Sequence, residues 1–294
     1  MLSILFIVSI TCCVCCSVED RRVFASLKGH NGTIRSVSFN QAAHAPNLLA
    51  SGGAGDCRPR VWDISTGQCV STLSPHDAAI HSVLWDTESH DTHNTNLVVS
   101  GDESGTLMIH DIRLSYNTNI LQVEASSLGS HSLGGSSNSS GICHMSLSQG
   151  SGSGTGTGYG SMLGIGCVGG YVSLFNMNTR SVVATTKLHG DDCRAVCMFN
   201  QFNHNNPNHN PNPSHATMLT TSFDSKASVW DVDTTIGGRG FSNICQLSNS
   251  NTGEMPQSQS HSHTDKILGC CMNDNQDILT TGADGKVLCW KPRV

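Results

Sequence analysis

Three groups of side chains in this sequence have the types that a serine hydrolase uses, and each group also contains a tryptophan. A carboxylate can orient an imidazole, and the second imidazole nitrogen can bond a hydroxyl, as in a nucleophile and its base. An indole N–H can complete the chain of bonds, so that each polar group has a partner. We therefore expect buried structural networks and no catalytic residue. The groups are His30, Ser51, Asp56 and Trp62; His189, Thr220, Asp224 and Trp230; and His263, Thr280, Asp284 and Trp290.

Short strands are needed to position such networks, and the sequence repeats one strand signal. In each repeat a His is followed by apolar or sulfur-containing residues four, seven and nine positions later, and the last two lie on one face of a strand. Three repeats continue with small residues, an Asp and a Trp six positions after the Asp. This predicts two more strands and a tight turn whose N–H groups the Asp accepts. The repeats begin at His30, His76, His189 and His263.

This pattern resembles the WD-repeat family from about Arg22 to the C-terminus. The resemblance implies an all-β fold, a WD-repeat β-propeller of about five four-stranded blades. A strand expected at 22–28 precedes the first repeat, and the chain ends after the third strand of the last one, so we expect 22–28 to complete that blade. The alternative is a truncated seven-bladed propeller. The expected blades span about 30–74, 76–124, 141–188, 189–247 and 263–294 together with 22–28.

The second and third repeats depart from the pattern. The second keeps His76 and Asp111, but His110 stands where a Trp is expected and Ser104 where the turn Asp is expected. The third lacks the Gly-His pair, and Gly169 replaces its Asp. We therefore expect these two blades to depend on packing and ladder hydrogen bonds alone. The strands of the third repeat are expected at 142–147, 162–167 and 171–176.

The composition argues against nucleic-acid, metal and cofactor binding. Charged residues are only 13% of the chain and the net charge is −6. Without a basic block, nucleic-acid binding through a cationic surface is excluded. The His-rich insertions lack a Cys or carboxylate at structural-metal spacing, so we expect no metal and no cofactor. These insertions contain His204, His209, His215 and His261, and the low-complexity segments, expected to be flexible, are 125–140, 150–160, 200–215 and 248–261.

The N-terminus leaves three interpretations open: a signal or anchor, a buried strand, or a remnant of the gene start. Residues 2–18 form an uncharged apolar run that is shorter than the ~20 residues of a membrane span and lacks a positive n-region. The fourteen cysteines do not suit a disulfide framework, which favours a reducing compartment. We expect a cytoplasmic chain. The alternative is export or membrane anchoring through 2–18, with glycan on Asn31 or Asn138.

The rim of a propeller can bind other proteins. Phe223 directly precedes a turn Asp, which is expected to place the ring on a rigid turn, as interface anchors often are. Arg35 and Arg194 follow the first buried position of their strands and are expected at the channel mouth. The alternative is that Phe223 folds onto its own blade and the arginines pair with carboxylates.

We therefore expect a non-catalytic protein-interaction scaffold; the alternative is an extracellular propeller with a binding or enzymatic role. The segments 32–35, 53–57 and 263–266 are similar to a microtubule-linked neuronal member of the WD-repeat family. This second resemblance implies a microtubule-associated partner.

Overall fold

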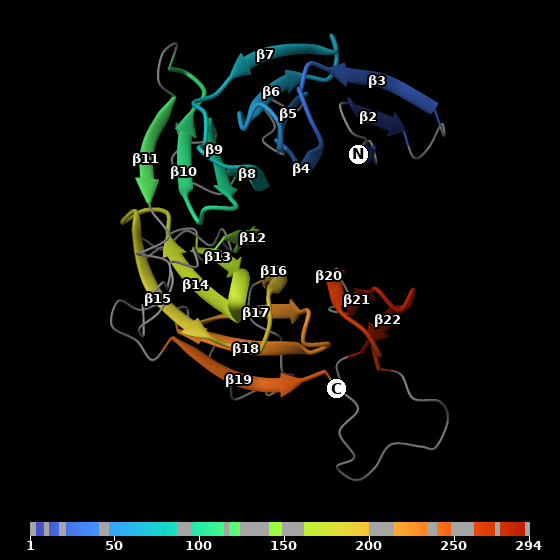
Figure 1. Cartoon of the computed structure of the whole chain (residues 1–294), viewed down its shortest axis with the longest axis vertical. Coiled ribbons are helices and arrows are strands. Elements are labelled where there is room, and N and C mark those ends of the chain that lie inside the picture. The colour runs from blue at the N-terminus through green and yellow to red at the C-terminus, as the bar shows by residue number, and fades with distance from the viewer. Residues whose placement is uncertain are drawn as a thin grey trace, which may run out of the picture. The chain divides into compact units, whose positions relative to one another are not determined.

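The computed structural model describes an all-β chain whose strands form six antiparallel sheets (Figure 1). The chain divides into two compact units, Met1–Ile142 and Cys143–Val294, and each is described by itself. The described part contains no helix that could span a bilayer. The described residues are 4–8, 12–17, 22–40, 47–86, 96–114, 118–123, 141–148, 162–199, 215–233, 240–247, 262–273 and 277–291.

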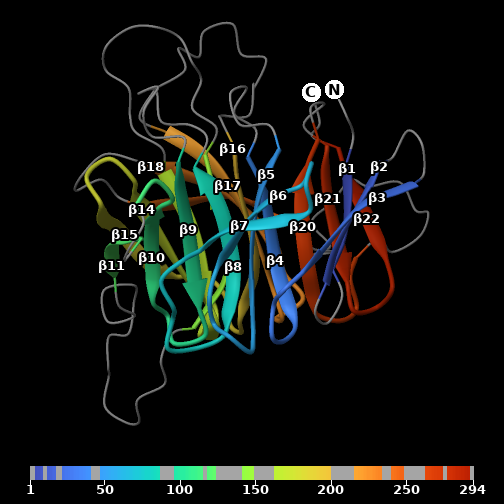
Figure 2. The same cartoon turned by 90° about the horizontal axis from the view of Figure 1, so that it is seen from above.

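The first unit contains one three-stranded sheet and two four-stranded sheets, which are blades I and II. Strands follow one another in chain order within each blade, because consecutive hairpins connect them. Figure 2 shows the strands of blade II, β8, β9 and β10, side by side. The strands are β1 (Ile4–Val8), β2 (Cys12–Ser17) and β3 (Arg22–Lys28); β4 (Ile34–Phe39), β5 (Leu48–Gly53), β6 (Arg60–Asp63) and β7 (Gln68–Thr72); and β8 (Ile80–Asp86), β9 (Leu97–Asp102), β10 (Leu107–Asp111) and β11 (Asn119–Val123).

The second unit contains blades III, IV and V. Blades III and IV have four strands, and the described sheet of blade V has three. The strands of blade III lie where the sequence predicts them. The elements are β12 (Ile142–Leu147), β13 (Met162–Cys167), the 3-10 turn η2 (Val168–Gly170), β14 (Tyr171–Asn176) and β15 (Ser181–Lys187); β16 (Cys193–Phe199), β17 (His215–Ser222), β18 (Ala227–Asp233) and β19 (Phe241–Gln246); and β20 (Ile267–Met272), β21 (Ile278–Gly282) and β22 (Val287–Trp290).

An extra residue interrupts the ladder at the same point in the first strand of four blades. In blade I, Ile34 pairs with Gly53 and Ser36 pairs with Gly52, which leaves Arg35 between them without a ladder partner. A bulge of this kind bends the strand and re-aims the side chain of the extra residue. The equivalent residues in blades II, IV and V are His81, Arg194 and Leu268.

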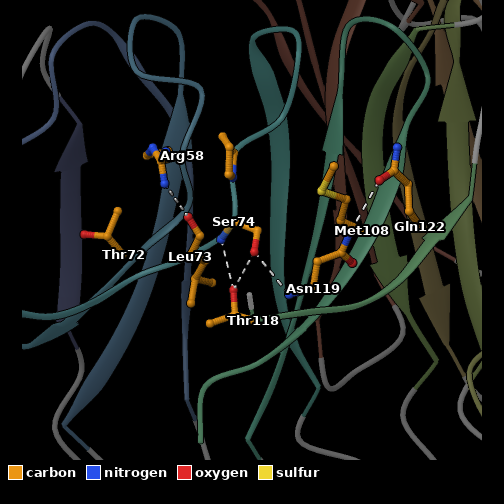
Figure 3. Close-up of a pocket in the computed structure, with 9 residues that line it drawn as sticks. Arg58, Thr72, Leu73, Ser74, Met108, Thr118, Asn119 and Gln122 are labelled. Atoms are coloured by element: carbon orange, nitrogen blue, oxygen red, sulfur yellow. Dashed lines mark hydrogen bonds between the residues drawn. The ribbon is translucent and has the colours of Figure 1, made fainter. Parts of the chain in front are cut away.

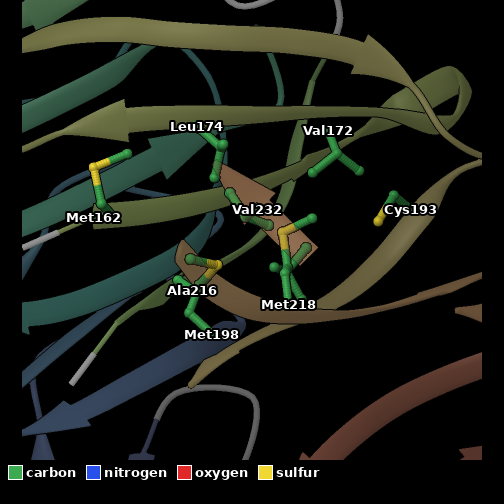
Figure 4. Close-up of a cluster of buried hydrophobic side chains, with 9 residues drawn as sticks. Met162, Val172, Leu174, Cys193, Met198, Ala216, Met218 and Val232 are labelled. Atoms are coloured by element: carbon green, nitrogen blue, oxygen red, sulfur yellow. The ribbon is translucent and has the colours of Figure 1, made fainter. Parts of the chain in front are cut away.

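The core lies between neighbouring blades of each unit. Between blades III and IV, apolar side chains of both sheets interdigitate (Figure 4). Small residues allow this close approach: a Cβ at Gly166 would lie 2.9 Å from Val196 Cγ2 of the next blade. The buried residues of this cluster are Met162, Val172, Leu174, Cys193, Val196, Met198, Ala216, Met218 and Val232.

Hydroxyls also join the first strands of neighbouring blades. Ser38 Oγ of blade I accepts a hydrogen bond from the Trp85 N–H of blade II at 2.9 Å. Ser146 Oγ of blade III accepts one from the Met198 N–H of blade IV at the same distance. Backbone donors that face another sheet are thereby satisfied.

The expected completion of the last blade by residues 22–28 concerns both units and stays a prediction. Within the first unit, β3 pairs with β2 and β2 pairs with β1, so residues 22–28 also join an N-terminal hairpin that the sequence did not predict. The physical reason is local: residues 4–8 and 12–17 are apolar segments with a short connection, and closing a short loop costs little chain entropy. The roles considered for residues 2–18 as a signal or anchor stay predictions.

Several sequence predictions concern segments outside the described residues. These include the flexibility of the insertions, the glycan site at Asn138, and the histidines His204, His209 and His261.

Candidate functional site

In blade IV the four side chains singled out in the sequence meet. Nδ1 of His189 lies 3.3 Å from Asp224 Oδ2, and Nε2 lies 2.8 Å from Thr220 Oγ1. Trp230 Nε1 donates to the same hydroxyl oxygen at 2.8 Å. Because an ionised carboxylate only accepts, His189 donates from Nδ1, and the Thr220 hydroxyl donates to Nε2. This chain of bonds, here called the polar relay, therefore requires a neutral imidazole.

Blades I and V contain the same polar relay. The indole donates to the hydroxyl at 2.7 Å in blade I and 2.9 Å in blade V, and the hydroxyl lies 2.7 and 2.9 Å from the imidazole Nε2. The imidazole Nδ1 lies 3.3 and 3.0 Å from the carboxylate. The residues are His30, Ser51, Asp56 and Trp62 in blade I, and His263, Thr280, Asp284 and Trp290 in blade V.

The relays have the bond pattern of a catalytic triad but not its access. Ser51, Thr220 and Thr280 are completely buried, and each hydroxyl oxygen already accepts an indole N–H. A nucleophile must reach its substrate, so these hydroxyls cannot act as one. Burial lowers the pKa of His30 and His189 despite the facing carboxylates, which keeps both imidazoles neutral, as the relay requires.

Blade II has a complete relay, which corrects the expectation that it depends on packing and ladder bonds alone. Asp102 Oδ2 lies 2.9 Å from His76 Nδ1, and Ser100 Oγ lies 2.6 Å from His76 Nε2. His110 takes the place of the indole, with Nε2 2.8 Å from Ser100 Oγ. Ser104, which stands at the expected Asp position, instead donates its hydroxyl to Asp102 Oδ1 at 2.6 Å.

The geometry of blade V explains how Asp102, two residues before the expected Asp position at Ser104, can bond the relay histidine of blade II. Gly282 and Asp102 hold the same ladder position, since both pair with the first residue of their blade's first strand. A Cβ at Gly282 would collide with His263 Nδ1 and lie 2.5 Å from Asp284 Oδ1. A side chain on the strand therefore enters the space that the turn carboxylate fills. Asp102 does not stand at the fixed spacing before the Trp position that the other repeats share, so the repeat pattern does not reveal it.

The relay of blade II is also longer than the others. His110 donates from Nε2, so its Nδ1 is free to accept from the Thr118 hydroxyl at 3.3 Å, whereas an indole has no acceptor. The Ser74 N–H donates to Thr118 Oγ1 at 2.9 Å. Burial lowers the pKa of His110 to about 3, which keeps the ring neutral. The relay thereby reaches the linker between blades I and II.

Blade III also departs from the expectation that it depends on packing and ladder bonds alone, because side-chain hydrogen bonds join its turn and two of its strands. At Gly169 the backbone turns with a φ of 75°, and the Gly169 N–H donates to Asp192 Oδ1 of the next blade at 2.9 Å. Ser173 and Thr185 share a hydroxyl contact of 2.9 Å across β14 and β15. In the part of the chain that is described, no His–Asp pair of the relay type joins these groups.

Phe223 and Arg194 come together on blade IV, at the turn between β17 and β18. The Arg194 guanidinium lies over the Phe223 ring, 5.0 Å from its centroid. Lys266, which precedes β20 in blade V, brings its ammonium to 4.5 Å from the same centroid. Phe223 and Arg194 are half-buried and Lys266 is exposed. We call these three residues the rim cluster.

The turn beneath the rim cluster is held by hydrogen bonds. The Phe223 N–H donates to the Asp192 carbonyl at 3.1 Å, and Asp224 Oδ2 accepts from the Gly190 N–H at 2.9 Å. The Ser222 hydroxyl donates to the Asp191 carbonyl at 2.9 Å. The aromatic ring is therefore presented by a fixed backbone rather than by a free loop.

The two cations of the rim cluster have no ion pair with a carboxylate among the described residues. The Arg194 guanidinium lies over the Phe223 ring and contacts Cys143 Sγ at 3.8 Å. Lys266 was not identified from the sequence, because its position shows only in the packing of blade V against blade IV. The one available signal was its place three residues after His263 in the repeat.

Arg35 has a different environment, in the first unit. Its Nη1 donates to Glu103 Oε1 at 2.6 Å and contacts His81 Nε2 at 2.5 Å. The His81 hydrogen bond and the Arg35 charge lower the pKa of Glu103. Arg35 is thus paired with a carboxylate, the alternative weighed for it in the sequence, and its charge is largely neutralised.

Among the described residues, no group of three or more His, Cys, Asp or Glu side chains could hold a metal ion. The relays are thus buried and hold the blades, whereas the rim cluster is half-buried at Phe223 and Arg194 and exposed at Lys266.

Comparison with known families identifies the repeats. Residues 21–63, 67–111 and 255–291 match the family described as WD domain, G-beta repeat. These matches and the antiparallel blades define the fold class as a WD-repeat β-propeller. Propellers of this class are generally non-catalytic interaction scaffolds.

Curated relatives share part of the chain. Protein tipD of Dictyostelium discoideum is 31% identical over 31% of this chain and 20% of its own length. F-box/WD repeat-containing protein sel-10 of Caenorhabditis elegans is 32% identical over 32% of this chain and 14% of its own. Guanine nucleotide-binding protein subunit beta of Zea mays is 30% identical over 30% of this chain and 23% of its own. The chain thus spans less than a quarter of the length of each relative.

Proposed function

We propose that this chain is a non-catalytic protein-binding scaffold and that a partner docks on the rim cluster. The observation that carries the proposal is the half-buried Phe223 ring with Arg194 and Lys266 beside it, 5.0 and 4.5 Å from its centroid. Aromatic and arginine side chains dominate the energy of protein interfaces when they lie on rigid elements. A relative with WD in its printed name, the F-box/WD repeat-containing protein sel-10, supports the class of function.

The chemistry of the cluster suggests the kind of partner surface. Both cations are free of carboxylates among the described residues, so a partner's Asp or Glu can supply the missing charge. The ring offers an apolar contact in the centre of the same surface. We therefore propose a partner segment that carries a carboxylate next to an apolar side chain.

A quantitative capture experiment with the full chain tests this function. The immobilised wild-type chain, Phe223→Ala and Lys266→Gln are exposed to the same cell extract, and bound proteins are quantified by mass spectrometry. We expect one set of proteins to fall at least fivefold on both variants, because each removes a contact from the same surface. Arg180→Gln removes an exposed arginine from a turn elsewhere and serves as the matched control.

The expected set should be retained by Arg180→Gln and weakened by added salt, since exposed charge pairs are screened. If Phe223→Ala and Lys266→Gln capture the same proteins as the wild type, the rim cluster is not the docking site.

Microtubule association is the finer form of this proposal. It rests on the similarity of segments 32–35, 53–57 and 263–266 to a microtubule-linked WD-repeat protein. Co-sedimentation of the full chain with assembled microtubules is the direct test. If the chain stays in the supernatant at all tubulin concentrations, the proposed microtubule association is wrong.

We propose a reducing, cytoplasmic location. Ten of the fourteen cysteines are free thiols, and burial raises the pKa of Cys143 to about 11, which keeps it protonated and unreactive. Alkylation of the native, unreduced chain after denaturation should label all fourteen cysteines by intact mass. Fewer labels, or a glycan mass on the exposed Asn31, would favour the exported alternative.

A further inference from the structure

A groove lies between blades I and II in the first unit, and none of its lining residues belongs to the rim cluster. It has a volume of about 510 Å³, within the range of pockets that enclose small ligands or a few peptide residues. Figure 3 shows side chains from both blades around it. The lining residues are Arg58, Thr72, Leu73, Ser74, Pro75, Met108, Thr118, Asn119 and Gln122.

The floor of the groove is fixed before any ligand arrives. Thr118 Oγ1 accepts from the Ser74 N–H at 2.9 Å, and Ser74 Oγ accepts from the Asn119 N–H at 3.2 Å (Figure 3). Thr118 is also the outer end of the blade II relay, through its bond to His110. A site whose groups are already held loses less freedom on binding.

Among the described residues that line the groove, one side chain is charged and none is a carboxylate. Arg58 is exposed, and its Nη1 donates to the Leu73 carbonyl at 3.4 Å. Among the described residues no carboxylate pairs with Arg58. The amide of Gln122 faces the groove with its nitrogen uncommitted in the described contacts, because the Asn119 amide reaches only Oε1, at 3.5 Å.

The remaining lining residues suit an extended peptide rather than a small free anion. Met108 and Leu73 are buried and supply an apolar base, while Thr72 and Pro75 are exposed at the margin. A free anion would use Arg58 alone, whereas a peptide can also cover the Met108 base and bond the amides of Asn119 and Gln122. The charge of the lining is complementary to an acidic side chain.

We propose that this groove binds a short acidic segment of a partner protein, with an Asp or Glu of that segment on Arg58 and its main chain against Asn119 and Gln122. The site is independent of the rim cluster and shares no residue with it. It gives the chain a second docking position with its own charge requirement.

Selection from a phage-displayed library of random peptides on the full chain tests the proposal. A parallel selection on Arg58→Gln identifies peptides that do not depend on Arg58, and these are set aside. The remaining enriched peptides are then titrated by fluorescence anisotropy. We expect peptides enriched in Asp and Glu whose affinity falls at least tenfold on Arg58→Gln. Gln122→Glu should weaken them as well, because it places a carboxylate opposite the ligand's own.

Two matched variants keep the outcome interpretable. Arg180→Gln removes an arginine outside the groove lining, and Phe223→Ala removes the rim anchor; both should leave the peptide affinity unchanged. Melting curves of all variants must match that of the wild type, as expected for the exposed Arg58 and Gln122. No enriched peptide, enrichment without acidic residues, or equal affinity for Arg58→Gln would each overturn the groove proposal, and none of them bears on the rim cluster.

Discussion

At the scale of single residues, the direction of each hydrogen bond in the relays follows from one rule. A carboxylate accepts, so the imidazole donates to it, and the other imidazole nitrogen must then accept from the hydroxyl. The same rule makes His110 a donor to Ser100 and an acceptor from Thr118. Thr and Ser, or Trp and His, can exchange places in a relay because each keeps the required donor.

The assignment of Asp102 to the blade II relay predicts how two alanine variants should differ. Asp102→Ala leaves the buried His76 Nδ1–H without its acceptor and should lower the free energy of unfolding by about 3 kcal/mol. Ser104→Ala removes one hydroxyl bond to Asp102 and should cost about 1 kcal/mol. Urea unfolding followed by circular dichroism measures both values. Equal losses would mean that Asp102 has no special place in the relay.

The buried His110 predicts a pH dependence of stability. Its pKa is lowered from 6.5 to about 3 by burial, so between these pH values the unfolded chain binds more protons than the folded one. Stability should therefore be unaffected by this group above about pH 6.5 and should fall below it, by about 2 kcal/mol at pH 5.

The variant His110→Gln isolates this contribution. Its amide can donate to Ser100 but does not titrate, so the variant should start less stable and lose about 2 kcal/mol less than the wild type between about pH 7.5 and pH 5. Urea unfolding at the two pH values gives the comparison. Both chains should retain some slope, because burial also lowers the pKa of His30, His144 and His189. Identical losses would show that His110 titrates normally.

At the scale of strands and blades, the features that could be predicted from the sequence are those that produce a regular spacing of residues. Apolar residues at fixed distances after His30 and His189 mark first strands, and the strands of blade III were found although its relay residues are missing. The features that could not be predicted from the sequence depend on which segments meet in the folded chain. The β1–β2 hairpin that pairs with β3 carries no repeat signal, and Lys266 meets Phe223 only through the packing of blade V against blade IV.

Loss of a serine that joins two first strands should destabilise the chain mainly at the boundary between those two blades. In Ser38→Ala the Trp85 N–H loses its acceptor, so the variant should be about 1 kcal/mol less stable. Amide hydrogen exchange at Trp85 should accelerate more than exchange elsewhere in β8, since only that donor is freed. Ser71→Ala on the outer strand β7 is the control and should change neither quantity. Uniform acceleration across blade II would argue against a specific joint.

At the scale of the whole molecule, the net charge of the chain is −6, and both proposed sites contain a cation that has no ion pair with a carboxylate among the described residues. One is Arg58 in the groove of the first unit, and the other is the rim cluster of the second. Elsewhere, Arg35 pairs with Glu103 and Arg60 pairs with Asp56. Unpaired cations beside apolar surface indicate sites where an acidic partner would complete the charge balance.

Two separate sites predict additive behaviour in the combined variant. Because the groove and the rim cluster share no residue, Arg58→Gln should weaken groove-selected peptides at least tenfold and leave rim-dependent capture intact, and Phe223→Ala should lower rim-dependent capture at least fivefold and leave the peptide affinity intact. The double variant should lose both without a further change in either. Anisotropy with the selected peptide and mass-spectrometric capture, run on the same four proteins, supply the two readouts. If Phe223→Ala weakens the groove peptide, or Arg58→Gln releases the rim-dependent partners, the two sites act as one surface and the independence argued from their separate linings is wrong.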